Sequence, residues 1–267
     1  MSVDSHIQLP RSIIDSFSEK KPVVGTNGFI NKADFVKVLS FGDDKIELIR
    51  TNDYGAENGY YTEDVEDLLN KEFESPLGET RKKLIEFAKK KRETVKIDKN
   101  DFIVIKKYLK MLFYRNKFFY NLYLNESKIA TSSNTSPSDY VQTCADLNVN
   151  PIDDFQRYSI AVVVKIGRRC FINSFTGFSF LSAKQISDKP VFFVSLSPEC
   201  GIAFFLPKSN DAKDVYLDHL ISDDDNTLDI NKQIAITEAI YSKHSLIAKN
   251  ESELVEVKEI LNDVKYK

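Results

Sequence analysis

The stretch DFIVIKKYLKMLFYRNKFFYNLYL, residues 101–124, is apolar enough for a membrane span but contains five cationic side chains. A span needs about 20 uninterrupted apolar residues, and Lys106, Lys107 and Lys110 interrupt the run early. On a helical wheel of about 100° per residue, these lysines share one arc with Lys117 and Asn121. The opposite, wide face is apolar and consists of Ile105, Tyr108, Leu109, Leu112, Phe119, Leu122 and Tyr123. The pattern predicts a central helix of a soluble core, with a narrow basic stripe that reaches water.

Arg115 departs from this pattern because it projects into the middle of the apolar face, where an unpaired guanidinium is costly to desolvate. The upstream stretch 62–92 predicts a second helix, broken or bent at Pro76 and Gly78. On its wheel Glu72 projects to the apolar side, whereas Glu66 and Glu74 project away from its centre. We therefore predict a Glu72–Arg115 pair that faces the interior. The pair could be structural, Arg115 could instead extend to the rim of the core, or both could line a functional cleft.

The remaining elements predict an α+β fold. FVKVLSF (35–41) and KIELIRT (45–51), separated by Gly42, predict a β-hairpin in a first half, 1–130, that is otherwise mostly helical. The loop TSSNTSPSD (131–139) leads into a second half, 139–267, that is mostly antiparallel sheet with two C-terminal helices. We expect this sheet to pack on the 101–124 helix, with continuous apolar runs such as IAVVV covered on both faces. The halves are predicted to form one domain, 1–267.

Cysteine, histidine and the amino terminus argue against several classes of protein. The three cysteines are far apart in the sequence, and the three histidines lack metal-ligand spacing, so neither a disulfide framework, a metal site nor a cofactor is predicted. The amino terminus lacks a basic leader followed by an apolar core, so we expect a cytoplasmic protein without a membrane segment. No glycine-rich phosphate loop or nucleophile elbow is present. The catalytic residues are therefore unknown, and it stays open whether the protein is an enzyme.

Charge is distributed unevenly along the chain. Residues 80–117 contain 14 Lys or Arg and four acidic residues, a balance of +10, whereas the rest of the chain carries −13. Such a segment could bind nucleic acid or an acidic protein partner, or it could simply be a solvated face. The nucleic-acid interpretation predicts a patch formed by Arg81, Lys82, Lys83, Lys89, Lys90 and Arg92.

Six short motifs follow one another along the chain. They are HIQLPRSIIDSF (6–17), an acidic helix step around Phe73, LFYR ending at Arg115, FINSFTGF (171–178), SLSP (195–198) and a helix containing Asn231. In this order they resemble a widespread bacterial family of unknown function, the domain family numbered four-two-three-eight. The resemblance implies a compact α+β protein of bacteria or their phages, of an accessory or defence-associated kind. The sequence departs from the family at Phe175, which stands where the family has an Asp, and at His6, one residue further from Pro10.

These observations combine into a candidate polar pocket. It consists of Glu72 and Arg115, together with His6 from the first motif and Asn173 and Ser174 from the fourth. A carboxylate, a guanidinium and an imidazole in one cleft could bind phosphate or transfer protons. One hypothesis is a host-defence effector that binds nucleic acid or a phosphate-bearing ligand. The alternative is a non-catalytic interaction protein, an inhibitor or regulator of a protein partner.

Overall fold

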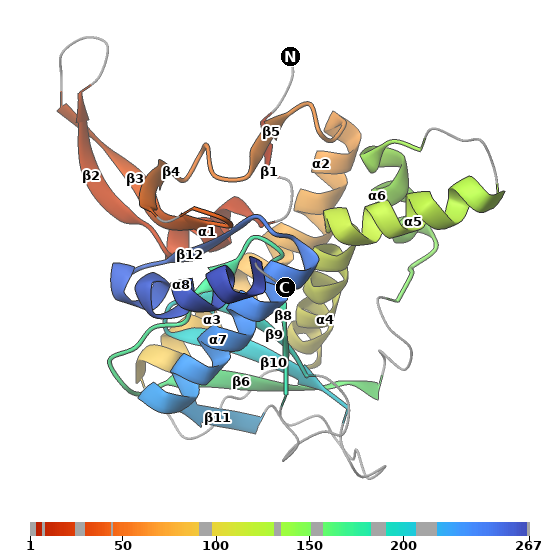
Figure 1. The fold of residues 1–267 in the computed structure, drawn as a ribbon. Helices are drawn as coiled ribbons and strands as arrows, with labels where there is room; N and C mark the ends of the chain where they lie inside the picture. The colour runs from red at the N-terminus through yellow and green to blue at the C-terminus, as the bar shows by residue number, and fades with distance from the viewer. Residues whose placement is uncertain are drawn as a thin grey trace.

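The computed structural model describes residues 4–6, 9–24, 30–43, 45–90, 98–130, 135–150, 157–182, 191–206 and 218–265. Mixed helix and sheet confirm the predicted α+β class (Figure 1). A five-stranded sheet dominates the second half, in the order β11 (Asp218–Ser222), β6 (Ser159–Lys165), β10 (Cys200–Phe205), β9 (Val191–Ser197) and β8 (Ser179–Leu181). The strands from β6 to β8 are antiparallel, as predicted, and β11 adds a parallel strand beside β6.

Helices cover both faces of this sheet. Alternate residues of β6 point to opposite sides, so Val162 enters one hydrophobic core and Val163 the other. The first core also includes helices α3 (Ser75–Lys90) and α4 (Lys99–Tyr114), and the second includes α7 (Asp224–Tyr241) and α8 (Glu251–Lys265) (Figure 1). This double burial explains the continuous apolar runs and confirms that the strands are covered on both sides. Phe113 of α4 stacks on Phe178 at 4.4 Å, so the long helix packs on the sheet region as predicted.

A second sheet joins the two halves of the chain. Its order is β2 (Glu19–Val24), β3 (Ile30–Ser40), β12 (Ser245–Ala248) and β7 (Asn173–Ser174), and β4 (Ile46–Arg50) pairs with β3 on its other side. The predicted hairpin is thus β3–β4, with Gly42 in a left-handed conformation in the connection. A separate pair consists of β1 (Asp4–His6) and β5 (Ala56–Asn58). The short helix α1 (Arg11–Ser16) contacts both β3 of the second sheet and β9 of the five-stranded sheet.

The predicted helix over 101–124 is in fact two helices, so that prediction is wrong. After α4 ends at Tyr114, Arg115 and Asn116 separate it from α5 (Lys117–Ala130). The Oδ1 atom of Asn116 accepts the N–H of Phe118 at 2.8 Å, and such a side-chain acceptor replaces the backbone acceptor of a continuing helix. Leu122 and Tyr123, placed on the buried face by the wheel, are consequently exposed.

The basic stripe of α4 also differs from the prediction. Lys106 and Lys110 are only 8% and 6% exposed. Helix α6 (Pro137–Asp146) and the residues after it cover this face, and the Nζ atom of Lys110 donates to Asn148 Oδ1 at 2.8 Å. Burial, together with the nearby charge of Lys110, lowers the pKa of Lys106 to about 8. Lys106 and Lys110 are therefore almost fully buried between two helices, whereas Lys107 of the same stripe is exposed as predicted.

The predicted helix over 62–92 contains a wide turn instead of a break. Helix α2 (Glu63–Leu69) continues through one π-helical turn, Asn70–Glu74, into α3 without interruption at Pro76 or Gly78. The N–H of Ser75 reaches back to the carbonyl of Asn70, which is the bonding pattern of a π turn. Proline lacks an N–H and its ring collides with the carbonyl four residues earlier. A widened turn just before Pro76 accommodates both effects, so the helix is not broken.

Candidate functional site

Arg115 is paired inside the protein, but with a different acid from the one predicted. Its side chain is 1% exposed and forms an ion pair with Glu74, whereas Glu72 is 55% exposed and meets Lys107 at 3.3 Å. The predicted Glu72–Arg115 pair is therefore wrong. The π turn is the physical reason. It contains one more residue than an α-helical turn, so the side chains in and after it point in other directions than an α-helical wheel predicts. Phe73 takes the buried position assigned to Glu72, and Glu74 reaches Arg115 from the edge of the core.

The surroundings of Arg115 are unusually polar for a core. Its guanidinium lies 5.7 Å from the centre of the Tyr61 ring, and burial raises the pKa of that tyrosine. The Tyr108 hydroxyl, one carboxylate oxygen of Glu66 and the Nδ2 atom of Asn116 are buried without a partner among the described residues. The arrangement ties the end of α4 to α2 and α3, as a structural ion pair does.

The other members of the predicted pocket lie in strands. Asn173 and Ser174 form β7 and are buried, and Asn173 uses both ends of its amide, donating to Ser195 O at 3.0 Å and accepting Ser174 N–H at 2.9 Å. The backbone of His6 pairs with Ala56 in the small sheet, and its side chain lies outside the described part. The residues of this pocket are thus distributed over β1, the π turn, the end of α4 and β7.

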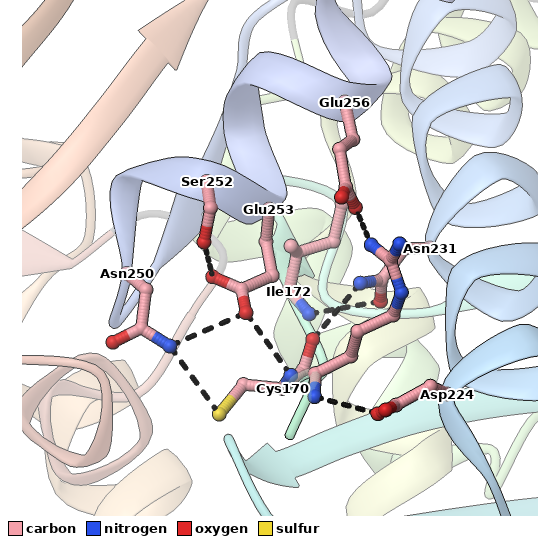
Figure 2. Close-up of polar contacts among 9 residues, drawn as sticks. Cys170, Ile172, Asp224, Asn231, Asn250, Ser252, Glu253 and Glu256 are labelled. Atoms are coloured by element: carbon pink, nitrogen blue, oxygen red, sulfur yellow. Dashed lines mark hydrogen bonds and ion pairs between the residues drawn. The ribbon is translucent and has the colours of Figure 1, made fainter. Parts of the chain in front are cut away.

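Three motifs of the sequence meet around the segment that leads into β7. Asn231 of α7 brackets this segment, since its Oδ1 accepts Ile172 N–H at 3.1 Å and its Nδ2 donates to Cys170 O at 2.9 Å (Figure 2). From the other side, the Ser195 hydroxyl donates to Ile172 O at 2.6 Å. FINSFTGF, SLSP and the Asn-bearing helix are therefore in direct contact. The backbone here has few strand partners, so side chains provide the hydrogen bonds that a neighbouring strand would otherwise provide.

Acidic side chains from two helices complete this bracket. Asp224 accepts Arg169 N–H at 2.8 Å, and Glu253 accepts Cys170 N–H at 3.2 Å and Asn250 Nδ2–H at 3.2 Å (Figure 2). Burial raises the pKa of Cys170, so its thiol stays protonated at neutral pH. The cluster in Figure 2 has the character of an anchor for the backbone.

A buried acid of α7 positions the residues after that helix. Glu238 is fully buried and accepts both the N–H and the hydroxyl of Thr176, at 3.0 and 2.7 Å, and the N–H groups of His244 and Ser245, at 3.0 and 3.2 Å. Burial raises the pKa of Glu238, against the effect of these donors. This carboxyl joins the turn after β7 to the start of β12 and fixes the backbone on which His244 stands.

The imidazole of His244 is held on one face and at one edge. It stacks on Phe175 with a centroid distance of 3.6 Å and an interplanar angle of 10°. Its Nδ1 lies 2.8 Å from the Ser245 hydroxyl, which lies 3.0 Å from the hydroxyl of buried Tyr54. Phe175 itself leaves no room for a side chain at Gly55, where a Cβ would lie 2.8 Å from the ring. His244 is nevertheless accessible to solvent, and its Nε2 has no partner among the described residues.

The electrostatic surroundings of His244 are cationic. Partial burial lowers its pKa below the ordinary value, and the ammonium of Lys117 lowers it further. The imidazole is therefore neutral at pH 7. Exposed Lys243 precedes His244 in a left-handed conformation. Phe118, the residue after Lys117, meets the ring of Tyr241 edge to face at 5.2 Å. A neutral ring nitrogen in the field of an ammonium can donate to an anionic ligand.

Most cations of the predicted nucleic-acid patch have partners within the chain, although the paired lysines themselves are exposed. Arg81 is turned inward, where it donates to Leu196 O at 3.1 Å and to the Ser16 hydroxyl. Lys82, Lys83 and Lys90 pair with Glu79, Asp101 and Glu86. Lys89 is exposed, and Arg92 lies outside the described residues. Acidic neighbours thus offset much of the charge counted in the sequence.

His244, Glu238 and Phe175 were not predicted as site residues, because they form no motif of known spacing. One signal was available for Glu238, which lies on the apolar face of its helix beside Ile234 and Ala235. The same test that singled out Arg115, a charge on an apolar face, also identifies Glu238. His244 offered no such signal, because its importance comes from its contact with Phe175 and, through Ser245, from Tyr54, both far away in the sequence.

No family model, curated protein or solved structure matches this chain. Within the part of the chain that the structure describes, no cluster of His, Cys, Asp and Glu is arranged to hold a metal ion. None of the helices in those same ranges combines the length and the apolar content needed to cross a bilayer.

Proposed function

We propose that the protein binds a phosphate-bearing ligand at His244. One observation carries the proposal: the ring is fixed by Phe175 and by the Ser245 hydroxyl, while its Nε2 has no partner among the described residues and lies in the field of Lys117. A phosphate group accepts hydrogen bonds and carries negative charge, so it complements an N–H donor next to an ammonium. Fixing the ring before binding reduces the entropy lost on association.

The hydroxyls behind the ring favour a proton on Nε2. Burial raises the pKa of Tyr54, which keeps its hydroxyl protonated. In our assignment Tyr54 donates to Ser245, and Ser245 donates to Nδ1, along contacts of 3.0 and 2.8 Å. A neutral imidazole whose Nδ1 accepts carries its proton on Nε2. His244 therefore presents a donor to solvent, as an oxygen of a phosphate group requires.

The environment favours a small ligand over a duplex. Phe118 and Tyr241 offer ring surfaces on which the base of a nucleotide could stack. By contrast, Arg81 is turned inward and the exposed Lys82, Lys83 and Lys90 have acidic neighbours, which weakens the case for tracking a phosphate backbone. A role in host defence, implied by the family resemblance, stays a prediction.

The test is isothermal titration calorimetry with inorganic phosphate and with adenosine monophosphate. In His244→Gln the amide nitrogen of glutamine replaces the Nε2 donor, whereas in His244→Asn the amide reaches only the Nδ1 position. We expect His244→Gln to retain binding and His244→Asn and Lys117→Gln to bind at least about tenfold more weakly. Lys89→Gln, in the predicted patch, is the control and should bind normally.

Three outcomes contradict the proposal. Equal binding by the His244→Asn variant and the unmodified protein would remove the imidazole from the site. Loss of binding in Lys89→Gln alone would move the site to α3. Absence of any binding of either probe by the folded, unmodified protein would exclude a phosphate site at His244. Thermal unfolding of each variant distinguishes lost binding from lost folding.

A further inference from the structure

The hairpin β2–β3 projects from the body of the molecule, and the last described residue pair of its two strands is apolar. Figure 1 shows both strands extending beyond the rest of the second sheet. Val24 and Ile30 are directly opposite each other in the antiparallel register, and they are 72% and 74% exposed. Exposed apolar residues are common singly, but a cross-strand pair on a projecting hairpin forms a contiguous surface.

The register shows which side chains share the face of this pair. Residues directly opposite each other point to the same side, and alternate pairs share a face. Val24–Ile30, Pro22–Lys32 and Lys20–Asp34 therefore lie on one face of the hairpin. The burial pattern agrees, because Lys20, Pro22 and Val24 are exposed while Glu19, Lys21 and Val23 between them are partly covered. We call Lys20, Pro22, Val24, Ile30, Lys32 and Asp34 the hairpin face.

The hairpin face carries a net charge of +1, because Lys20 and Lys32 outnumber Asp34, which is partly covered and lies opposite Lys20. Glu19 points to the other side, where Lys21 and Lys37 engage it at 3.1 and 2.8 Å, so it does not offset Lys20 or Lys32. The whole chain, by contrast, carries a net charge of −3. An apolar pair flanked by lysines on an acidic molecule complements a surface that is acidic around an apolar recess.

The edge of β2 determines how such a partner is bound. Pro22 has no N–H and sits in the middle of this edge strand, where a pairing strand would need a donor. Proline and lysine at an edge are devices that prevent strand addition. Contact through the side chains of the hairpin face is therefore favoured over extension of the sheet.

We infer that the hairpin face docks on an acidic protein partner, with Val24 and Ile30 entering an apolar recess and Lys20 and Lys32 meeting carboxylates around it. This site is independent of His244, so either proposal can fail without the other. The hairpin keeps its lysines near the apolar pair, so charge guides the encounter and burial of Val24 and Ile30 holds the complex.

The probes are short synthetic peptides that alternate Glu with Leu, Glu with Ser, or Lys with Leu, and binding is measured by fluorescence anisotropy. We expect the Glu–Leu peptide to bind, and the other two to bind at least about tenfold more weakly. Val24→Asp and Ile30→Asp, each tested singly, should weaken Glu–Leu binding by a similar factor, and so should the Lys20→Glu, Lys32→Glu double variant. Leu147→Asp is the matched control, because Leu147 is 71% exposed outside the hairpin.

The substituted side chains are exposed, and circular dichroism confirms that each variant is folded. Equal binding of the Glu–Leu peptide by Ile30→Asp and by the unmodified protein would overturn the inference, as would loss of binding in Leu147→Asp. Two further measurements oppose it if positive. One is hairpin-dependent binding to vesicles containing phosphatidylserine, which would assign the face to a membrane surface. The other is hairpin-dependent dimerisation in sedimentation, which would assign it to a second copy.

Discussion

The second sheet has two ends of opposite character. At the β12–β7 end every residue is buried, and side chains from α7 and α8 bind the backbone that leads into it. At the β2–β3 end the backbone groups pair within the hairpin, and the side chains of Val24 and Ile30 are exposed. At the buried end, polar side chains thus form hydrogen bonds with backbone groups that have no strand partner. At the hairpin end, strand pairing satisfies the backbone, so the side chains can form an exposed surface.

The largest expected effect is a loss of stability at the β12–β7 end. Replacing Glu238 by Ala leaves the N–H groups of Thr176, His244 and Ser245 and one hydroxyl without their acceptor in the interior. We expect the free energy of unfolding to fall by about 4 kcal/mol, because each orphaned donor is costly. Urea denaturation measures the change. Asp229→Ala, at an exposed position of the same helix, should change stability little; a loss below about 1 kcal/mol in Glu238→Ala would contradict this account.

The next effect concerns the bracket in Figure 2. Asn231→Ala removes the acceptor of Ile172 N–H and the donor to Cys170 O, both of them buried. A loss of about 2 kcal/mol is expected. Asn226→Ala serves as the control, since Asn226 is exposed near the start of the same helix. Thermal unfolding monitored by circular dichroism compares the two, and similar stabilities would show that Asn231 is not an anchor.

A smaller effect sharpens the same contrast within a single helical segment. Glu74→Gln leaves the buried guanidinium of Arg115 without its carboxylate, whereas Glu72→Gln removes only an exposed contact with Lys107. We expect the first variant to lose about 2 kcal/mol, since Glu74 is partly exposed, and the second to stay within about 0.5 kcal/mol of the parent protein. Chemical denaturation of both variants gives the difference. The reverse order would restore the pairing that the helical wheel predicts.

The smallest effect is a change of pKa and not of fold. The ammonium of Lys117 disfavours protonated His244, so Lys117→Gln should raise the pKa of His244 towards 6.5. Protonation of this histidine costs the folded state more than the unfolded chain, so stability declines as the pH falls below about 6.5, and it should decline less in the variant. Proton NMR of the ring Cε1–H follows the titration. An unchanged pKa would place Lys117 outside the site.

The sequence predicted those elements that local patterns decide. Gly42 between two apolar runs predicted the β3–β4 hairpin, and the uninterrupted run in β6 predicted a strand covered on both faces. Two helix predictions were wrong at positions where one side chain or one turn alters the register. Asn116 takes a backbone donor and divides a helix, and the π turn carries Glu72 outward.

The candidate site was harder to predict because it is assembled from distant segments. Asn173 and Ser174 were placed in the right strand, but their bonds are structural. His244 depends on the ring of Phe175 and, through Ser245, on the hydroxyl of Tyr54. Both residues are distant in the chain, and no local spacing encodes such contacts. A charge count near Arg81 has no access to such contacts either, since it does not show which cations have partners in the fold.

The π turn also has a consequence for recognising related sequences. Because Asn70–Glu74 accommodates one surplus residue, a relative with an ordinary α-helical turn here would align with a single-residue gap between Leu69 and Ser75. Leu77, Leu84 and Phe87 would keep their places in the core on the far side of that gap. An alignment that forbids such a gap would shift these three positions onto the solvent side and hide the relationship.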